Sequence, residues 1–253
     1  MSVPRQARKK SKTGIYHIVL RGVNKQNIFE DDDDRRFFLT LLAHFKEICG
    51  YEIYAYCLMD NHVHLELKEG FEPLGTSIKR IIGKYVLAYN KKHERCGHLF
   101  QERFKSEPIE TDSYFLTVLR YILQNPDKAN LQGKLQNRLW TSYIEYINGA
   151  RIVDTGFVLA MFTENISQAL KQFNQFINRS SDEKCLEYED KVSLSDMELI
   201  EYINDLGLKS EEIRNLPNSD RDAIIRKLKT LDGITIRQIA KITGLSKSMV
   251  GRI

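Results

Sequence analysis

The residues that could do chemistry begin with two histidines one residue apart. His62 and His64 flank Val63 in an apolar run that is typical of a strand. Because alternate residues of a strand point to the same face, both imidazoles should project together. Imidazole nitrogens bind transition metals, and also Mg²⁺ or Mn²⁺ when a phosphate supplies further oxygens. The pair could equally be two ordinary, half-exposed histidines.

A tyrosine and an asparagine form the second candidate pair. Tyr121 and Asn125 are four residues apart in a predicted helix, so they share one side of it. Tyr121 lies off the apolar stripe that contains Leu119. A phenol can attack phosphorus when a metal polarises the phosphate, and an amide oxygen could complete the metal's ligands. The alternative is a tyrosine that only packs.

Alternating strands and helices must position these two pairs. Residue periodicity predicts the order β-α-β-β-α-β-α in the first half of the chain. The strands are predicted at 15–23, 51–59, 62–67 and 104–109, and the helices after Asp31–Asp34, around Ile78–Tyr89 and over 112–125. The acids suit a helix N-terminus better than a metal site, and the third helix should stop before Pro126. This order predicts the α+β class, with a ferredoxin-like split βαβ antiparallel sheet and one extra helix.

The remainder of the chain is predicted to be helical. Its boundaries are expected near 145 and 210, and the polar segment Asp182–Asp190 is a candidate linker. The predicted parts are therefore residues 1–145, a helical extension and linker at 146–209, and a module at 210–253. Helices in the module are predicted over 220–231, 235–243 and 246–253.

The last segment has the spacing of a helix-turn-helix. Counted from position 236, Ala240, Gly244 and Val250 stand at the fifth, ninth and fifteenth positions, where a small residue, a positive φ and an apolar residue are needed. Ser246 suits the N-cap of the next helix. A plain helical hairpin is the alternative. The residues expected to face the major groove of duplex DNA are Lys247, Ser248 and Arg252.

Five stretches of residues 1–145, in this order, resemble the single-tyrosine HUH transposases. They are similar above all to the REP-associated tyrosine transposases and to insertion-sequence transposases that move single-stranded DNA. The stretches are YHIVLRGVN (16–24), LMDNHVH (58–64), GHLFQERFKS (97–106), LRYILQNP (119–126) and WTSY (140–143). The resemblance implies an HUH endonuclease fold for residues 1–145.

The resemblance implies a metal-dependent DNA transposase that cleaves and rejoins single-stranded DNA. Tyr121 would attack a phosphodiester, become joined to the 5′-phosphate and release a 3′-hydroxyl. His62, His64 and Asn125 would bind a divalent metal, Mg²⁺ or Mn²⁺. Family members recognise hairpin or repeat ends, so structured single-stranded DNA is the expected partner.

Asn125 departs from one branch of the family. The insertion-sequence branch usually has glutamine there, whereas asparagine is similar to what REP-associated members carry. His17, on the first strand, is expected to be a buried structural residue, or else a contact to DNA or to a metal ligand. Two other functions stay open: a catalytically silent DNA-binding regulator, and a replication or relaxase-type HUH nickase.

The charge pattern favours a polyanionic partner. The 253 residues carry a net charge of only +4. Yet residues 1–25 hold seven basic and no acidic residues, 77–105 eight against two, and 226–252 seven against one. Nucleic acid fits these basic stretches, although such stretches are also common on solvated surfaces. Phe104, between two basic residues, could stack an unpaired base or simply pack. The expected DNA contacts in the transposase-like part are Arg21, Asn24, Lys25, Arg103 and Lys105.

The composition excludes several other classes. The chain is 42% hydrophobic and 28% charged, as globular proteins are, and it has no apolar run near the ~18 residues of a membrane span. Its four cysteines form no C-x-x-C pair, which argues against a disulfide scaffold or zinc finger. The starting segment lacks the apolar core of a secretory signal. We expect a bacterial, cytoplasmic, nucleoid-associated protein, as a monomer or a homodimer, with no membrane partner.

Overall fold

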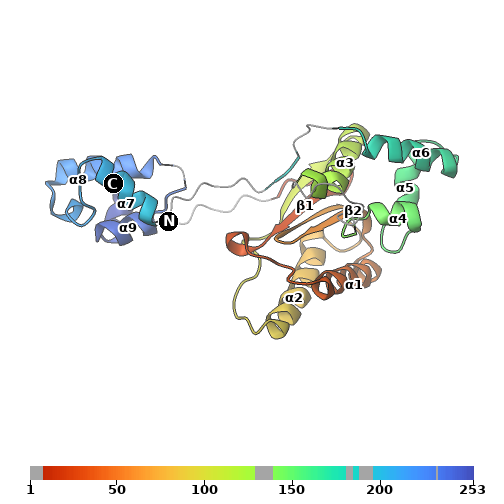
Figure 1. Ribbon diagram of the computed structural model, residues 1–253, viewed down its shortest axis with the longest axis horizontal. Coiled ribbons are helices and arrows are strands. Elements are labelled where there is room, and N and C mark those ends of the chain that lie inside the picture. The colour runs from red at the N-terminus through yellow and green to blue at the C-terminus, as the bar shows by residue number, and fades with distance from the viewer. Residues whose placement is uncertain (1–7, 129–138, 181–184, 188–195, 232) are drawn as a thin grey trace. The chain divides into compact units, whose positions relative to one another are not determined.

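The computed structural model describes residues 8–128, 139–180, 185–187, 196–231 and 233–253. The chain divides into two compact units, Met1–Tyr188 and Glu189–Ile253. Each unit has its own hydrophobic core (Figure 1). The predicted boundaries near 145 and 210 fall within these units, and the three-part division stays a prediction.

An antiparallel sheet of four strands, in the order β2-β3-β1-β4, forms the centre of the first unit. The strands are β1 (Ile15–Arg21), β2 (Glu52–Met59), β3 (His62–Lys68) and β4 (Lys105–Ile109). β1 pairs with β3 on one side and with β4 on the other, and β2 pairs with β3. This is the split βαβ arrangement, so the predicted α+β, ferredoxin-like fold is confirmed.

Two long helices cover one face of the sheet (Figure 1). α1 (Asp32–Cys49) and α2 (Leu74–Lys92) pack against each other through apolar residues at helical spacing. Asp31 is the N-cap of α1, and its side chain accepts a hydrogen bond from the amide of Asp34. The acidic run therefore serves a helix N-terminus, as predicted.

One helix, α3 (Asp112–Lys128), covers the opposite face (Figure 1) and packs on β2 and β3. The prediction that this helix stops before Pro126 is wrong, because α3 runs through Pro126 to Lys128. Proline lacks an amide hydrogen and crowds the carbonyl four residues earlier. Pro126 lies in the last turn of α3, so the missing hydrogen bond and the crowding affect only that end of the helix. Asn125 therefore keeps its helical position one turn beyond Tyr121.

The segment that follows closes the outer edge of β2. Backbone hydrogen bonds of 2.7–3.0 Å join residues 140–154 to Ile53, Tyr56 and Leu58 of β2. Pairing of this kind removes the exposed amides and carbonyls of an edge strand. The helices of this region are α4 (Tyr143–Asn148), α5 (Thr155–Ala160) and α6 (Ile166–Ile177).

Glu145 of α4 holds this segment in place through hydrogen bonds. Its Oε2 accepts hydrogen bonds of 2.7–3.0 Å from the amides of residues 151–153. Its Oε1 accepts one of 2.9 Å from the Tyr56 hydroxyl. Because Glu145 is only 4% exposed, these four donors depend on it for their hydrogen bonds.

The second unit is helical, as predicted. Its elements are α7 (Asp196–Asp205), η3 (Ile213–Asn215), α8 (Asn218–Lys229), α9 (Ile236–Thr243) and α10 (Lys247–Arg252). Between α9 and α10, Gly244 has a φ of 68°, and the Ser246 side chain accepts from the amide of Met249. Ala240 and Val250 are buried.

In the described parts of both units, no helix combines the length and apolarity needed to cross a membrane.

Candidate functional site

His62 and His64 lie on the face of the sheet that α3 covers. Their ring centroids are 5.0 Å apart. His64 is buried and His62 half-buried. The strand therefore projects both imidazoles together, as their spacing predicts.

Tyr121 reaches the histidines from α3. Its ring meets His64 edge-on, with centroids 5.6 Å apart, and His17 at 5.9 Å. The Asn125 side chain lies beside both Tyr121 and His62 and affects the pKa of each. Tyr121 and Asn125 are 4% and 8% exposed. The two residue pairs that the sequence places on separate elements thus meet in one cluster.

His17 of β1 stands behind His64. Nε2 of His17 is 3.0 Å from Nδ1 of His64, and the two rings stack. This contact occupies Nδ1 of His64 and leaves its Nε2 for another ligand. The expectation that His17 is buried is confirmed, because its side chain has no exposed surface.

Asn61 orients His62 and ties it to the loop after β1. Its Oδ1 is 2.6 Å from Nδ1 of His62, and its Nδ2 donates to the carbonyl of Lys25. Lys25 ends the short helix η1 (Val23–Lys25), in which Asn24 and Lys25 have φ values of 50° and 61°. Such positive φ values cost energy for non-glycine residues and concentrate at functional sites. The sequence indicated only a turn at Asn61, although its place directly before the histidine pair was a signal.

Burial keeps the imidazoles of the cluster neutral. Desolvation lowers the pKa of His62, lowers that of His64 well below its ordinary value, and lowers that of His17 to about 3. Neutral imidazole is the form that binds metals, so no proton has to be displaced at neutral pH. His62 and His64, with the amide of Asn125, therefore fit a divalent metal ion.

A carboxylate from a distant part of the chain contacts the Tyr121 hydroxyl. Tyr121 donates a hydrogen bond to Oε1 of Glu187, which is 66 residues further along. Burial, and then the negative charge of Glu187, raise the pKa of Tyr121. Of the predicted linker Asp182–Asp190, residues 185–187 are described, and the rest lies outside the described residues. Nothing in the sequence pointed to Glu187.

Glu66 continues the row of His62 and His64 along β3. It is fully buried, and among the described residues neither of its carboxylate oxygens has a hydrogen-bond partner. Burial raises the pKa of Glu66 well above its ordinary value. Its side chain is therefore held as a neutral carboxyl group at a pH where exposed glutamates are charged.

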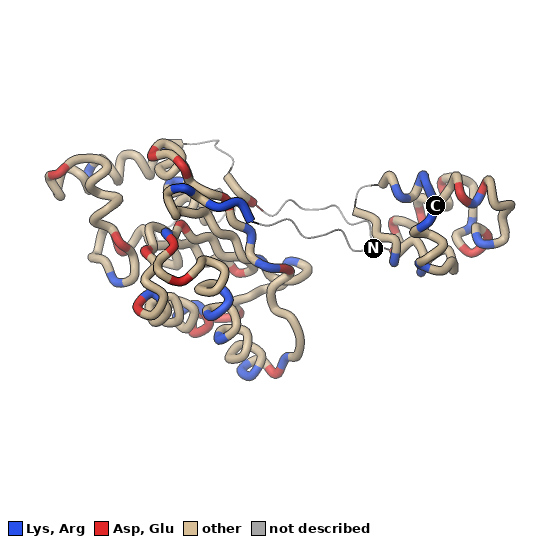
Figure 2. Tube along the Cα trace, turned by 180° about the vertical axis from the view of Figure 1, so that it is seen from behind, with Lys and Arg blue, Asp and Glu red and all other residues tan. Residues whose placement is uncertain are grey.

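Three of the predicted DNA contacts lie at the end of the sheet that carries the cluster. Arg21 pairs with His62 in the β1–β3 register, and its charge lowers the pKa of His62. Asn24 and Lys25 follow in η1. Lysines and arginines also occur over the rest of both units (Figure 2).

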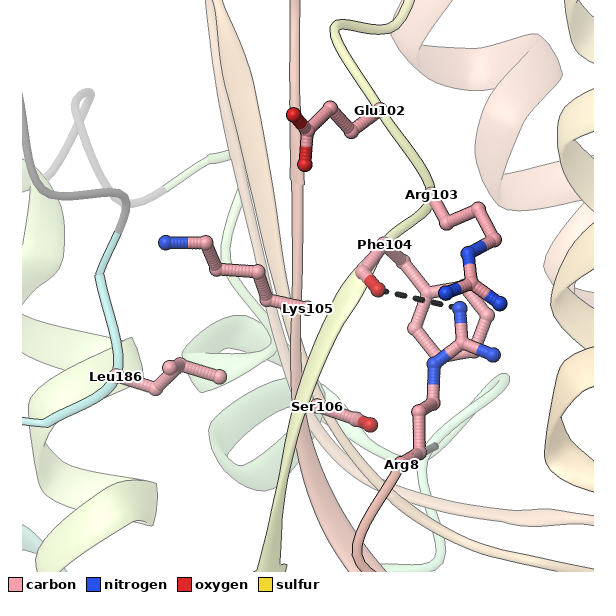
Figure 3. Close-up of a pocket in the computed structure, with 7 residues that line it drawn as sticks. All are labelled: Arg8, Glu102, Arg103, Phe104, Lys105, Ser106 and Leu186. Carbon is pink, nitrogen blue, oxygen red and sulfur yellow. Dashed lines mark hydrogen bonds between the residues drawn. The ribbon is translucent and has the colours of Figure 1, made fainter. Parts of the chain in front are cut away.

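The two basic residues beside Phe104 point to opposite sides of β4 (Figure 3). Lys105 reaches the carbonyl of Glu187, the residue whose carboxylate accepts from Tyr121, at 3.4 Å. Arg103 instead lines a hollow of about 480 Å³ with Arg8, and is not brought to the tyrosine. The Phe104 ring is buried beneath the Arg8 guanidinium, 3.6 Å from the ring centroid. Lys247, Ser248 and Arg252 lie exposed on α10 of the second unit.

A second group of candidate metal ligands, Asp31, Asp34 and His93, joins the start of α1 to the end of α2. Lys92 lies among them, with its Nζ 2.7 and 2.8 Å from the two Asp31 oxygens and 2.8 Å from Asp34. Nε2 of His93 is 2.9 Å from Asp34. The lysine ammonium already neutralises these carboxylates, so a metal ion would have to displace it.

Residues 10–125 match the model of the family described as IS200-like transposase. Among curated proteins, no sequence matches the chain. One similar solved structure is a REP-associated tyrosine transposase bound to a REP hairpin, with 17% identity and a TM-score of 0.48 over 58% of this chain and 86% of that one. Another is a Deinococcus radiodurans R1 protein named as a transposase, with 15% identity and a TM-score of 0.34 over 47% and 95%. The family match includes the whole sheet and ends at Asn125, so residues 10–125 of this chain are similar to the IS200-like transposase family.

Proposed function

We propose that this transposase cleaves and rejoins single-stranded DNA with Tyr121 as its nucleophile and a divalent metal as its cofactor. The observation that carries the proposal is the position of Asn125, whose side chain lies beside both Tyr121 and His62 and affects the pKa of each. A nucleophile and a metal-binding donor set are thereby linked inside the part of the chain that matches the transposase family.

His62, His64 and Asn125 would hold Mg²⁺ or Mn²⁺. When bound, the metal would offset the negative charge on the phosphate under attack. The Tyr121 oxygen would attack phosphorus, the 3′-oxygen would leave, and the 5′-phosphate would stay joined to the tyrosine. Attack by another 3′-hydroxyl would reverse this step and join two strands. Because the phosphotyrosine ester conserves the broken bond, no nucleotide hydrolysis is needed.

Single-stranded DNA with hairpin or repeat ends is the proposed substrate. Arg21, Lys25 and Lys105 would bring phosphates to the cluster through charge, without regard to sequence, and Asn24 would add a polar contact. Arg103 would contact DNA further from Tyr121, beside Phe104. Binding of this kind weakens steeply as salt is added.

A denaturing gel tests the proposal. The full chain is incubated with Mn²⁺ or Mg²⁺ and labelled single-stranded oligonucleotides that carry the hairpins flanking its gene, from both strands. We expect a covalent adduct that is lost in Tyr121→Phe and in His62→Ala. Tyr114→Phe is the matched control, because Tyr114 lies on the same helix but donates its hydrogen bond to Glu107.

The two alternative functions, regulator and nickase, predict different results on this gel. Binding of DNA without any adduct would favour the catalytically silent regulator. An adduct that never joins to a second strand would favour the replication or relaxase-type nickase. An adduct that persists in Tyr121→Phe would remove Tyr121 from the mechanism.

We also propose that the second unit binds duplex DNA as a helix-turn-helix. The left-handed turn at Gly244, the Ser246 cap and the burial of Val250 support this proposal. In the double variant Lys247→Glu, Arg252→Glu we expect weaker duplex binding with a smaller salt dependence, and unchanged adduct formation on single strands. Ser248 would contribute a hydroxyl to the same surface.

A homodimer stays a prediction, which sedimentation velocity of the full chain tests.

A further inference from the structure

Residues 185–187 lie across the Tyr121 hydroxyl. Glu187 accepts the hydrogen bond that this hydroxyl donates. Lys105 of β4 holds the same residue by its carbonyl at 3.4 Å. Cys185 packs against the core of the first unit, and Leu186 lies on the Lys105 side of β4 (Figure 3). The contacts of Cys185 and Leu186, together with the bond from Lys105 to the Glu187 carbonyl, therefore hold the Glu187 carboxylate at the hydroxyl.

A buried tyrosine needs a proton acceptor to act as a nucleophile. The Tyr121 side chain is 4% exposed, so solvent has little access to its hydroxyl. When the oxygen bonds to phosphorus, its proton must move to a neighbouring group. His62 and His64 would use their nitrogens for the metal, and the Asn125 amide is not a base. His17 contacts His64 through its Nε2, and among the described residues Glu187 is the base that already accepts a hydrogen bond from the Tyr121 hydroxyl.

We propose that Glu187 is the general base of strand cleavage, an inference that rests on the proposed nucleophilic role of Tyr121. The phenolic proton passes to Oε1 of Glu187 as the bond between Tyr121 and phosphorus forms. The bond from phosphorus to the 3′-oxygen breaks, and its electron pair leaves on that oxygen, which takes a proton from solvent. Glu187 returns its proton to solvent, so the overall proton count is unchanged.

The same carboxyl group serves the joining step. When a 3′-hydroxyl attacks the phosphotyrosine, the tyrosine leaves as a phenolate that needs a proton. The attacking 3′-hydroxyl releases its proton to solvent as its oxygen bonds to phosphorus, and Glu187, which takes a proton back from solvent, gives that proton to the phenolate at the position of the present hydrogen bond. Glu187 lies outside residues 10–125, so the assignment concerns a part of this chain beyond the family match.

The test compares single-turnover adduct formation by the full-length wild type and Glu187→Gln, with Mn²⁺ and the same hairpin oligonucleotides. We expect Glu187→Gln to slow the reaction about 10²- to 10⁴-fold while DNA binding is retained. Glu187→Asp should recover part of the rate. Glu164→Gln, an equal change of charge on an exposed turn before α6, should keep the wild-type rate.

The dependence of the rate on pH separates a base from a residue that only supports the fold. The wild-type rate should depend little on pH because Glu187 takes the phenolic proton, whereas the Glu187→Gln rate should rise with pH as phenolate forms. Among the described residues, the charged and titratable groups near Glu187 and the Tyr121 hydroxyl include Lys105 from β4, His62 from β3 and Cys185 from the same segment, and all are retained in Glu187→Gln.

Each other outcome overturns a defined statement. An unchanged or faster rate in Glu187→Gln overturns the general-base assignment alone. A pH profile parallel to that of the wild type overturns it as well. If the wild type forms no adduct, or if Tyr121→Phe still forms one, the proposed function fails and the inference fails with it.

Discussion

Nε2 of His17 lies 3.0 Å from Nδ1 of His64, so a histidine of the first strand fixes the ring of a proposed metal ligand on the third. The two residues meet because β1 and β3 are neighbours in the sheet. With Nδ1 engaged, His64 presents Nε2 to the cluster, in one tautomer and one orientation.

Loss of this contact should weaken metal binding. We expect His17→Ala to lower the affinity for Mn²⁺ about 10- to 100-fold, the usual effect of removing a residue that supports a metal ligand. His17→Gln, which can still hydrogen-bond with His64, should lose less. Isothermal titration calorimetry measures both, with exposed His44→Ala as the control. Equal affinities in His17→Ala and the wild type would contradict the positioning role.

We expect the side-chain oxygen of Asn125 to contribute to metal binding. Asn125→Leu keeps the approximate size of the side chain but removes its polar atoms from beside Tyr121 and His62, so we expect at least about tenfold weaker Mn²⁺ binding. Asn125→Asp retains an oxygen and adds a negative charge, so Mn²⁺ should bind more tightly. If the two variants bind the metal alike, Asn125 does not contact the metal.

The buried Glu66 makes folding stability depend on pH. Its pKa is raised above its ordinary value of 4.5, so the unfolded chain releases this proton at a lower pH than the folded domain does. The free energy of unfolding should therefore fall as pH rises above 4.5, by up to about 1.4 kcal/mol per pH unit.

The variant Glu66→Gln isolates this effect. The buried histidines act in the opposite direction, because their lowered pKa values make stability rise as pH rises toward their ordinary value of 6.5. We expect the stability of Glu66→Gln relative to the wild type to grow with pH above 4.5, in urea unfolding with EDTA present. A difference that does not change with pH would show that Glu66 is ionised in the folded protein.

Removing Glu145 should destabilise the first unit strongly. Glu145→Ala leaves three backbone amides and the Tyr56 hydroxyl without their acceptor, at a cost of about 3 kcal/mol or more. Glu145→Gln keeps one acceptor oxygen and should lose less. Urea unfolding measures both, and exposed Glu164→Ala should stay within about 0.5 kcal/mol of the wild type. A Glu145→Ala loss as small as that would mean that water replaces the carboxylate.

The sequence predicts this fold well where a signal lies within one element. The predicted strand 62–67 corresponds to β3 (His62–Lys68), and the predicted helix 235–243 to α9 (Ile236–Thr243). His62 and His64 project from the same face of the sheet because side chains of a strand repeat every two residues. The predicted end of α3 was wrong because Pro126 removes only one hydrogen bond, so the helix continues for two residues beyond it.

Contacts between elements are less predictable. The approach of His17 to His64 depends on the register between two strands that lie far apart in the chain. The contact of Tyr121 with Glu187 spans 66 residues and carries no periodic signal. Residue spacing therefore predicts each residue pair of the site, and only the three-dimensional structure brings the pairs together and adds Glu187.

The backbone pairing of residues 140–154 with β2 limits where the gene can be cut or fused without exposing the edge of the sheet. A fragment that ended with α3 would leave the amides and carbonyls of β2 open to strand addition and aggregation. Gene fusion or recombination that cuts the chain at that point would yield a fragment prone to aggregate. The sheet domain and the segment through residue 154 are therefore expected to pass between genes as one unit.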